Sequence, residues 1–87
     1  METFEKKIKT LLLELFPEHE LQLETEPDGR VSGFIISDKF ADMDHLGRQR
    51  KIWSLLRKNL TKTEQRKVLG FVAFTPAEHE AYSEPSV

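Results

Sequence analysis

Residues 36–53 read ISDKFADMDHLGRQRKIW, and this stretch is the most informative about the fold because it leads from an apolar strand into two helical segments. Ser37 and Asp38 have the short polar side chains that favour helix N-caps, so they predict a short helical turn around Lys39 and Phe40. The stretch therefore predicts the end of a strand, a capped turn of helix and the beginning of a long helix.

The long helix is expected from about residue 44 to residue 59, with Asp42 or Asp44 as its N-cap. It is amphipathic, because its basic side chains lie largely away from its apolar ones. The residues expected on or beside its core face are Leu46, Ile52, Trp53, Leu56 and Leu60. We interpret the tryptophan as part of this core stripe.

Basic charge is concentrated in and just after this helix. The chain has a formal charge of -2, yet residues 48–67 carry +7 and the other residues carry -9. The basic residues of the segment are Arg48, Arg50, Lys51, Arg57, Lys58, Lys62, Arg66 and Lys67. Such segregation indicates either a binding surface for an anionic partner or the solvated face of a helix.

Upstream of the stretch, the sequence predicts a helix and a β-hairpin. Apolar residues recur with helical spacing over residues 4–16, and Pro17 ends that helix. Residues 20–26 alternate between polar and apolar, and an apolar strand follows at residues 31–37. Pro-Asp-Gly at residues 27–29 forms the turn between these two strands.

Downstream, residues 61–66 are polar and predict a loop, whereas residues 67–75 are apolar at nearly every position. A continuous apolar run is typical of a strand covered on both sides rather than an edge strand. Roughly 30 residues with a helix separate it from the strand at 31–37, which is enough for the crossover of a parallel pair.

The last strand ends in a clear capping signal. Thr75 is the expected N-cap, Pro76 suits the first helical position, and Glu78 completes a capping box. A short C-terminal helix is expected to follow, with a flexible tail at residues 83–87.

The fold class is therefore α+β, in the order α-β-β-α-α-β-α, with a three-stranded mixed sheet and helices packed on it. The length suits a single domain over residues 1–87, with an ordered core at about residues 2–82. Without cysteine the chain has no disulfide, thiolate nucleophile or sulfur ligand for a metal. No membrane-spanning run or secretory signal is present, so we expect a cytoplasmic protein.

Two motifs resemble those of the BolA family. A Ser-Asp-x-Phe before a short helix and an Arg-x-Arg in the long helix are matched by Ser37, Asp38, Phe40, Arg48 and Arg50. The family's Thr-Pro-x-Glu after the last strand is matched by Thr75, Pro76 and Glu78. The expected element order is also that of BolA-like domains, whose sheet is related to the type II KH arrangement, and the resemblance spans residues 2–82.

Departures from the family pattern concern its metal chemistry. The resemblance implies a histidine that ligates a [2Fe–2S] cluster shared with a monothiol glutaredoxin, but counting back from Pro76 places Lys67 there. A protonated lysine has no lone pair for a metal. The second family ligand, a cysteine or histidine between the first two strands, is missing from residues 26–30, and Gln49 replaces the histidine of Arg-His-Arg. We therefore expect no cofactor and no metal ligand in this chain.

Two functions remain open. The resemblance implies a non-enzymatic regulatory or adaptor protein that binds a protein partner, for which a monothiol glutaredoxin is a candidate. The alternative is DNA or RNA binding through residues 48–67, although the Gly-x-x-Gly loop of KH domains is absent. Arg48 and Arg50 could instead pair with Asp38 or Asp42 and stabilise the fold.

Histidines and carboxylates suggest no catalytic or metal site. His19 and His79 each lie between two glutamates, but neighbouring residues do not point at one ion, so we interpret both triplets as surface charge. His45, near a helix N-terminus, is also expected at the surface. No catalytic residue is predicted, because neither a nucleophile with a base nor a glycine-rich phosphate loop is recognisable.

Overall fold

The structure is a computed structural model that describes residues 3–83. Its elements are α1 (Phe4–Leu12), the 3₁₀ turn η1 (Glu18–Glu20), β1 (Leu21–Thr25), β2 (Val31–Ile36), the 3₁₀ turn η2 (Asp38–Phe40), α2 (His45–Asn59), α3 (Lys62–Arg66), β3 (Val68–Phe74) and α4 (Pro76–Ser83). No helix in this part of the chain is long and apolar enough to span a membrane. Ser83, the first residue of the expected tail, is the last residue of α4. The rest of that tail, residues 84–87, lies outside the described part of the chain.

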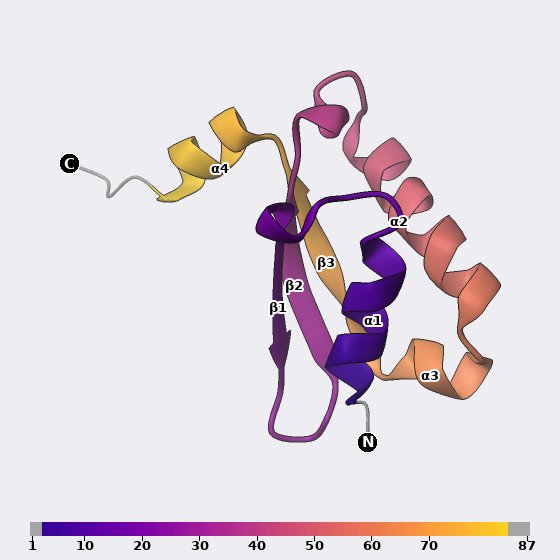
Figure 1. Cartoon of the computed structure of the whole chain (residues 1–87). Helices are drawn as coiled ribbons and strands as arrows, with labels where there is room; N and C mark the ends of the chain where they lie inside the picture. The colour runs from indigo at the N-terminus through magenta and orange to yellow at the C-terminus, as the bar shows by residue number, and fades with distance from the viewer. Residues whose placement is uncertain (1–2, 84–87) are drawn as a thin grey trace.

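The sheet has the order β1-β2-β3, with β2 antiparallel to β1 and parallel to β3. This arrangement confirms the expected α+β fold with a mixed three-stranded sheet. Helices α1 and α2 cover one face, while α3 and α4 lie at opposite ends of β3 (Figure 1). The crossover from β2 to β3 therefore places α2 and α3 together at the side of the molecule.

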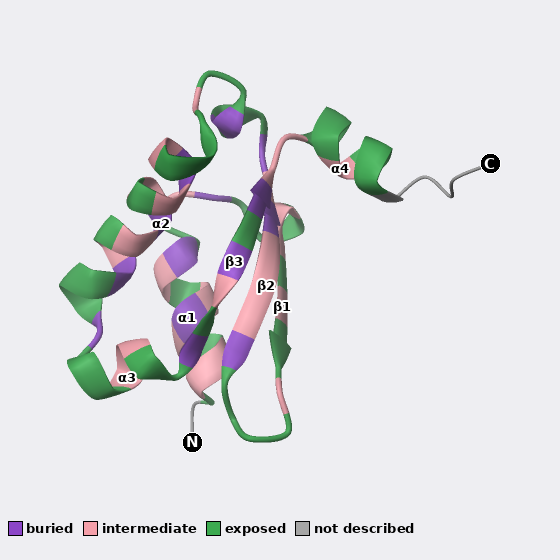
Figure 2. Cartoon of the chain, turned by 180° about the vertical axis from the view of Figure 1, so that it is seen from behind, coloured by how far each residue is buried: buried purple, intermediate pink, exposed green. Residues whose placement is uncertain are grey.

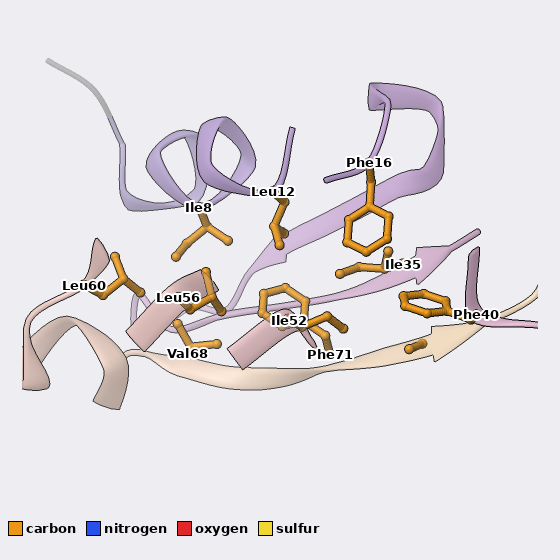
Figure 3. Close-up of a cluster of buried hydrophobic side chains, with 11 residues drawn as sticks. Ile8, Leu12, Phe16, Ile35, Phe40, Ile52, Leu56, Leu60, Val68 and Phe71 are labelled. Carbon is orange, nitrogen blue, oxygen red and sulfur yellow. The ribbon is translucent and has the colours of Figure 1, made fainter. Parts of the chain in front are cut away.

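The core lies between α1, α2 and the sheet (Figure 3). Its fully buried side chains are Ile8, Leu12, Phe16, Val31, Ile35, Phe40, Ile52 and Leu56. Burying one such side chain contributes about 1.5–3 kcal/mol, so these contacts fix how α2 sits on the sheet. The aromatic pair at one end is Phe16 and Phe40, with ring centroids 5.3 Å apart.

Side-chain caps start the helices where the sequence predicts them. Ser37 accepts a hydrogen bond from the Lys39 amide at 3.2 Å and begins η2. Asp44, rather than Asp42, caps α2 through the Gly47 amide at 2.7 Å. The first helix is shorter than expected, because its regular part ends at Leu12 and the chain continues in tighter turns before Pro17.

The expectation that the last strand is covered on both sides is wrong. β3 is an edge strand, and its outward-facing Leu69 and Val72 are 47% and 42% exposed. The opposite side of the sheet from α1 and α2 carries Phe34 and Phe74, with ring centroids 6.2 Å apart. Tyr82 of α4 contacts both rings, so Phe74 contributes to the apolar run of β3 without lying in the main core, whereas Phe71 of the same strand is a core residue.

The expectation of a loop at residues 61–66 is also wrong, because Lys62–Arg66 form α3 and Thr61 is its N-cap. Thr61 and Glu64 make a reciprocal capping box, in which the Thr61 hydroxyl accepts from the Glu64 amide at 3.1 Å. The Thr-x-x-Glu spacing was present in the sequence, but no apolar periodicity accompanied it. The basic residues Lys62 and Arg66 therefore lie on a helix next to α2 rather than in a loop.

Candidate binding site on α2 and α3

Two neighbouring hollows lie on the outer side of α2 and α3, and both include Trp53 and Arg57. The larger has a volume of about 390 Å³ and is lined by Trp53, Arg57, Lys62, Gln65 and Arg66. The smaller has a volume of about 240 Å³ and is lined by Leu46, Gln49, Arg50, Trp53 and Arg57. We call these eight residues the basic groove; exposed positions of both helices are shown in Figure 2.

The groove carries four cations, from Arg50, Arg57, Lys62 and Arg66. Among the described residues, no carboxylate lines either hollow. The structure therefore brings together half of the eight basic residues that the sequence marks. Four cations without a local acid create a positive potential that favours an anionic ligand.

Glu64, the acid nearest in sequence to these cations, is directed elsewhere. Its carboxylate pairs with the Lys7 ammonium of α1 and accepts a hydrogen bond from the Thr61 amide at 2.9 Å. The hydrogen bond from Lys7, followed by that from the Thr61 amide, holds the pKa of Glu64 below its ordinary value. Because this acid is used by the fold, it does not line the groove.

Trp53 is not simply a core residue, contrary to the expectation from the sequence. It packs partly against the core but is only half-buried, and it lines both hollows. The guanidinium carbon of Arg57 lies 5.8 Å from its ring centroid, within cation–π range. The buried face of α2 instead follows Arg48, Ile52 and Leu56, which are four residues apart.

Leu46 is a second correction to the expected core stripe, because it is 58% exposed. It lies on the wall of the smaller hollow. Leu46 and Trp53 are seven residues apart and so lie on the same side of α2. In the structure that side lies at the boundary between the core and the solvent.

Arg48 does not belong to the exposed basic surface, although its place in the basic segment of the sequence predicted that it would. It is 5% exposed, and its guanidinium donates to the Met43 and Ala73 carbonyls, each at 3.0 Å. The same group donates to Glu78 Oε1 at 2.6 Å, so its ion-pair partner is neither Asp38 nor Asp42. A buried arginine with these partners joins α2, β3 and α4.

Three other basic residues from the sequence segment, Lys51, Lys58 and Lys67, line neither hollow. Lys67 ends α3, and its ammonium lies 5.9 Å from the centroid of the Phe4 ring. The basic groove therefore includes only part of the basic surface predicted from the sequence, and Lys58 and Lys67 are exposed outside it.

Glu78 serves both the cap of α4 and the Arg48 pair. Its carboxylate accepts from the Thr75 amide at 2.8 Å, and its own amide donates to the Thr75 hydroxyl at 3.2 Å. This confirms the predicted capping box. The hydrogen bond from Arg48, followed by that from the Thr75 amide, lowers the pKa of Glu78 from 4.5 to about 2.

We expect the stability of the protein to depend on the ionised Glu78 carboxylate. Its pKa is lower in the folded chain, so its contribution is complete above pH 4.5 and is lost as pH falls toward about 2. In urea unfolding at a series of pH values, the Glu78→Gln variant should lose less stability across this range than the unchanged protein. Parallel pH curves for the two proteins would contradict this role.

The positions at which the resemblance implies cluster ligands, Lys67 and the turn at residues 26–30, lie close together, but their side chains do not fit an iron–sulfur cluster. Lys67 lies next to the end of the hairpin, because its carbonyl accepts from the Val31 amide at 2.8 Å. The neighbouring Arg30 pairs with Asp28 at 2.6 Å. Neither position offers the imidazole or thiolate that such a cluster requires. Within residues 3–83 no group of three or more His, Cys, Asp or Glu side chains could hold a metal ion.

Gln49 and His79 also have roles that the sequence did not indicate. The Gln49 amide donates to the Phe71 carbonyl at 2.8 Å, which ties α2 to β3. The His79 ring lies 6.4 Å from the Phe34 centroid and 6.2 Å from the Phe74 centroid. His79 is therefore part of the aromatic cluster on the sheet rather than surface charge alone, whereas His19 and His45 are exposed as expected.

Comparison with known proteins identifies the fold. No protein-family model and no curated protein matches the sequence. The structure is similar to that of BolA1 from Arabidopsis thaliana, with a TM-score of 0.71 and 24% sequence identity. The match covers 90% of this chain and 98% of that chain. The chain therefore has a BolA-like fold, as the motifs of the sequence predicted.

Proposed function

We propose that this chain with a BolA-like fold is a non-enzymatic regulatory or adaptor domain that binds a protein partner through the basic groove. The observation that carries the proposal is the pairing of Trp53 with Arg57 between two hollows. Tryptophan and arginine are enriched among the residues that dominate binding at protein interfaces. The cytoplasm is the compartment in which we place this function.

The partner is expected to present acidic side chains around an apolar group that enters a hollow. Four lining cations would meet the acids, and Trp53 would contact the apolar group. A monothiol glutaredoxin is the candidate that resemblance to the BolA family suggests. We propose that this chain supplies no ligand to a cluster in such a complex, because Lys67 and residues 26–30 lack the required donors.

Reversing two groove charges tests the proposed surface. We expect the double variant Arg57→Glu and Lys62→Glu to bind a monothiol glutaredoxin about tenfold or more weakly, because like charges then face each other. Lys6→Glu with Lys58→Glu is the matched control, since it changes net charge equally at exposed positions that do not line the groove.

Isothermal titration calorimetry would measure both affinities, with circular dichroism as a check of folding. An equal loss in the two double variants would show that only overall charge matters. Unchanged binding by the groove variant would place the partner on another surface.

A second candidate function is nucleic-acid binding, which is favoured by the absence of a carboxylate among the groove residues described. Four phosphate contacts would give a log–log slope of affinity against salt of about -3.6 with duplex DNA and about -2.8 with a single strand. The same double variants apply: the groove variant should lose most binding to DNA and the control much less. Binding that does not weaken with salt would contradict an electrostatic contact with phosphates.

A further inference from the structure

We infer that the basic groove takes single-stranded nucleic acid, with Trp53 as the platform on which an unpaired base stacks. The inference rests on the second of the two proposed functions and adds the class of nucleic acid. It is carried by the position of the indole between two hollows that are otherwise lined largely by cations.

The indole is placed for contact with a flat ligand. Trp53 packs partly against the core, remains half-exposed and lines both hollows, and the guanidinium carbon of Arg57 lies 5.8 Å from its ring centroid. A stacked base would therefore share the exposed part of the indole with the Arg57 guanidinium. Bases of a duplex stack on each other and cannot offer a free face, whereas those of a single strand can stack on aromatic side chains. An aromatic platform inside a cationic groove therefore favours a single strand.

Cations flank the indole on both sides, as a continuous phosphate backbone requires. Arg50 lies in the smaller hollow, Lys62 and Arg66 lie in the larger, and Arg57 belongs to both. A single strand that crosses Trp53 would thus meet a positive side chain before, beside and after the stacked base. The two hollows would hold successive nucleotides.

The polar groups of the groove predict tolerance of base sequence. The side-chain amide of Gln65 donates to the Leu60 carbonyl at 3.1 Å, and that of Gln49 donates to the Phe71 carbonyl at 2.8 Å. Because each amide donates one N–H to the backbone, its orientation is tied to the fold, and we expect stacking and phosphate contacts to dominate binding over recognition of base edges.

Trp53 is the chain's single tryptophan, so tryptophan fluorescence reports on this site alone. We would titrate the full chain with a short oligothymidine and, separately, with the same strand paired in a duplex. The single strand should quench the fluorescence and bind more tightly. By anisotropy of a labelled strand, Trp53→Leu should weaken binding roughly 5- to 150-fold, the usual effect of losing one stacked base.

Trp53→Phe retains an aromatic face and should recover most of the affinity lost in Trp53→Leu. Lys58→Ala is the control on the same helix outside the groove and should change binding little, whereas Arg57→Ala should weaken it clearly. Amide spectra would confirm that each variant is folded.

Equal binding of duplex and single strand, with no effect of Trp53→Leu, would overturn the stacking inference and leave electrostatic nucleic-acid binding standing. No binding to either DNA would overturn both, while the proposed binding of a protein partner would stand on its own test.

Discussion

Replacing Phe40 with alanine is expected to lower the free energy of unfolding by about 3–5 kcal/mol. Phe40 is fully buried, packs against Phe16 with ring centroids 5.3 Å apart, and lies under the Arg48 guanidinium at 5.7 Å. Alanine would leave a cavity where η2, α2 and the sheet meet. A loss of this size is a large part of the total stability of a small domain.

Phe34→Ala is the matched control for this prediction, because the same atoms are removed from a half-buried ring on the opposite side of the sheet. Urea unfolding followed by circular dichroism should show a smaller loss for Phe34→Ala than for Phe40→Ala. Similar losses in the two variants would mean that the complete burial of Phe40 in η2 does not determine its contribution to the free energy of unfolding.

Replacing Arg48 with methionine is expected to lower the free energy of unfolding by about 3 kcal/mol. Methionine retains much of the apolar stem but removes the charge-assisted hydrogen bonds of the guanidinium, each worth about 1.5–3 kcal/mol when intact. The Met43 and Ala73 carbonyls would lose a donor, and Glu78 would lose its cation. A buried apolar methionine is stabilising in itself, so the expected loss is smaller than the sum of the energies of the lost hydrogen bonds.

The control is Arg50→Met, the same substitution two residues later at an exposed position of α2. It should hardly change the urea midpoint, whereas Arg48→Met should shift it clearly. If Arg50→Met were as destabilising as Arg48→Met, the greater burial of Arg48 would not explain its contribution to the free energy of unfolding. In binding assays the order should reverse, because Arg50 lines the groove and Arg48 does not.

Local signals in the sequence predicted most of the secondary structure. Caps depend on residues three or four positions apart, so a cap at Asp42 or Asp44 before α2 and the Thr75–Glu78 box before α4 were recognisable, and the structure shows Asp44 as the cap of α2. Alternation and the Pro-Asp-Gly turn predicted the hairpin, and the crossover length predicted the parallel pair. These features are confirmed because each is determined within a short stretch of chain or by its length.

Features that depend on distant residues were not predicted. The burial of Arg48 requires Glu78, which lies 30 residues later and reaches it only when α4 follows β3 at the end of the sheet. Composition alone could not distinguish a doubly covered strand from β3, whose outward apolar residues lie beside an aromatic cluster. Helical periodicity likewise placed Trp53 on the apolar side of α2. It could not show that a hollow between Trp53 and α3 would leave the indole partly exposed.

We propose that the basic groove is the binding surface of this domain, and amide NMR titration would map the binding surface residue by residue. Labelled protein would be titrated separately with a monothiol glutaredoxin and with a short single-stranded DNA. We predict shifts concentrated at the lining residues of α2 and α3, with little change at Phe34, Val72 and Tyr82 on the other side of the sheet. Shifts confined to that opposite side, or none with either ligand, would contradict the account.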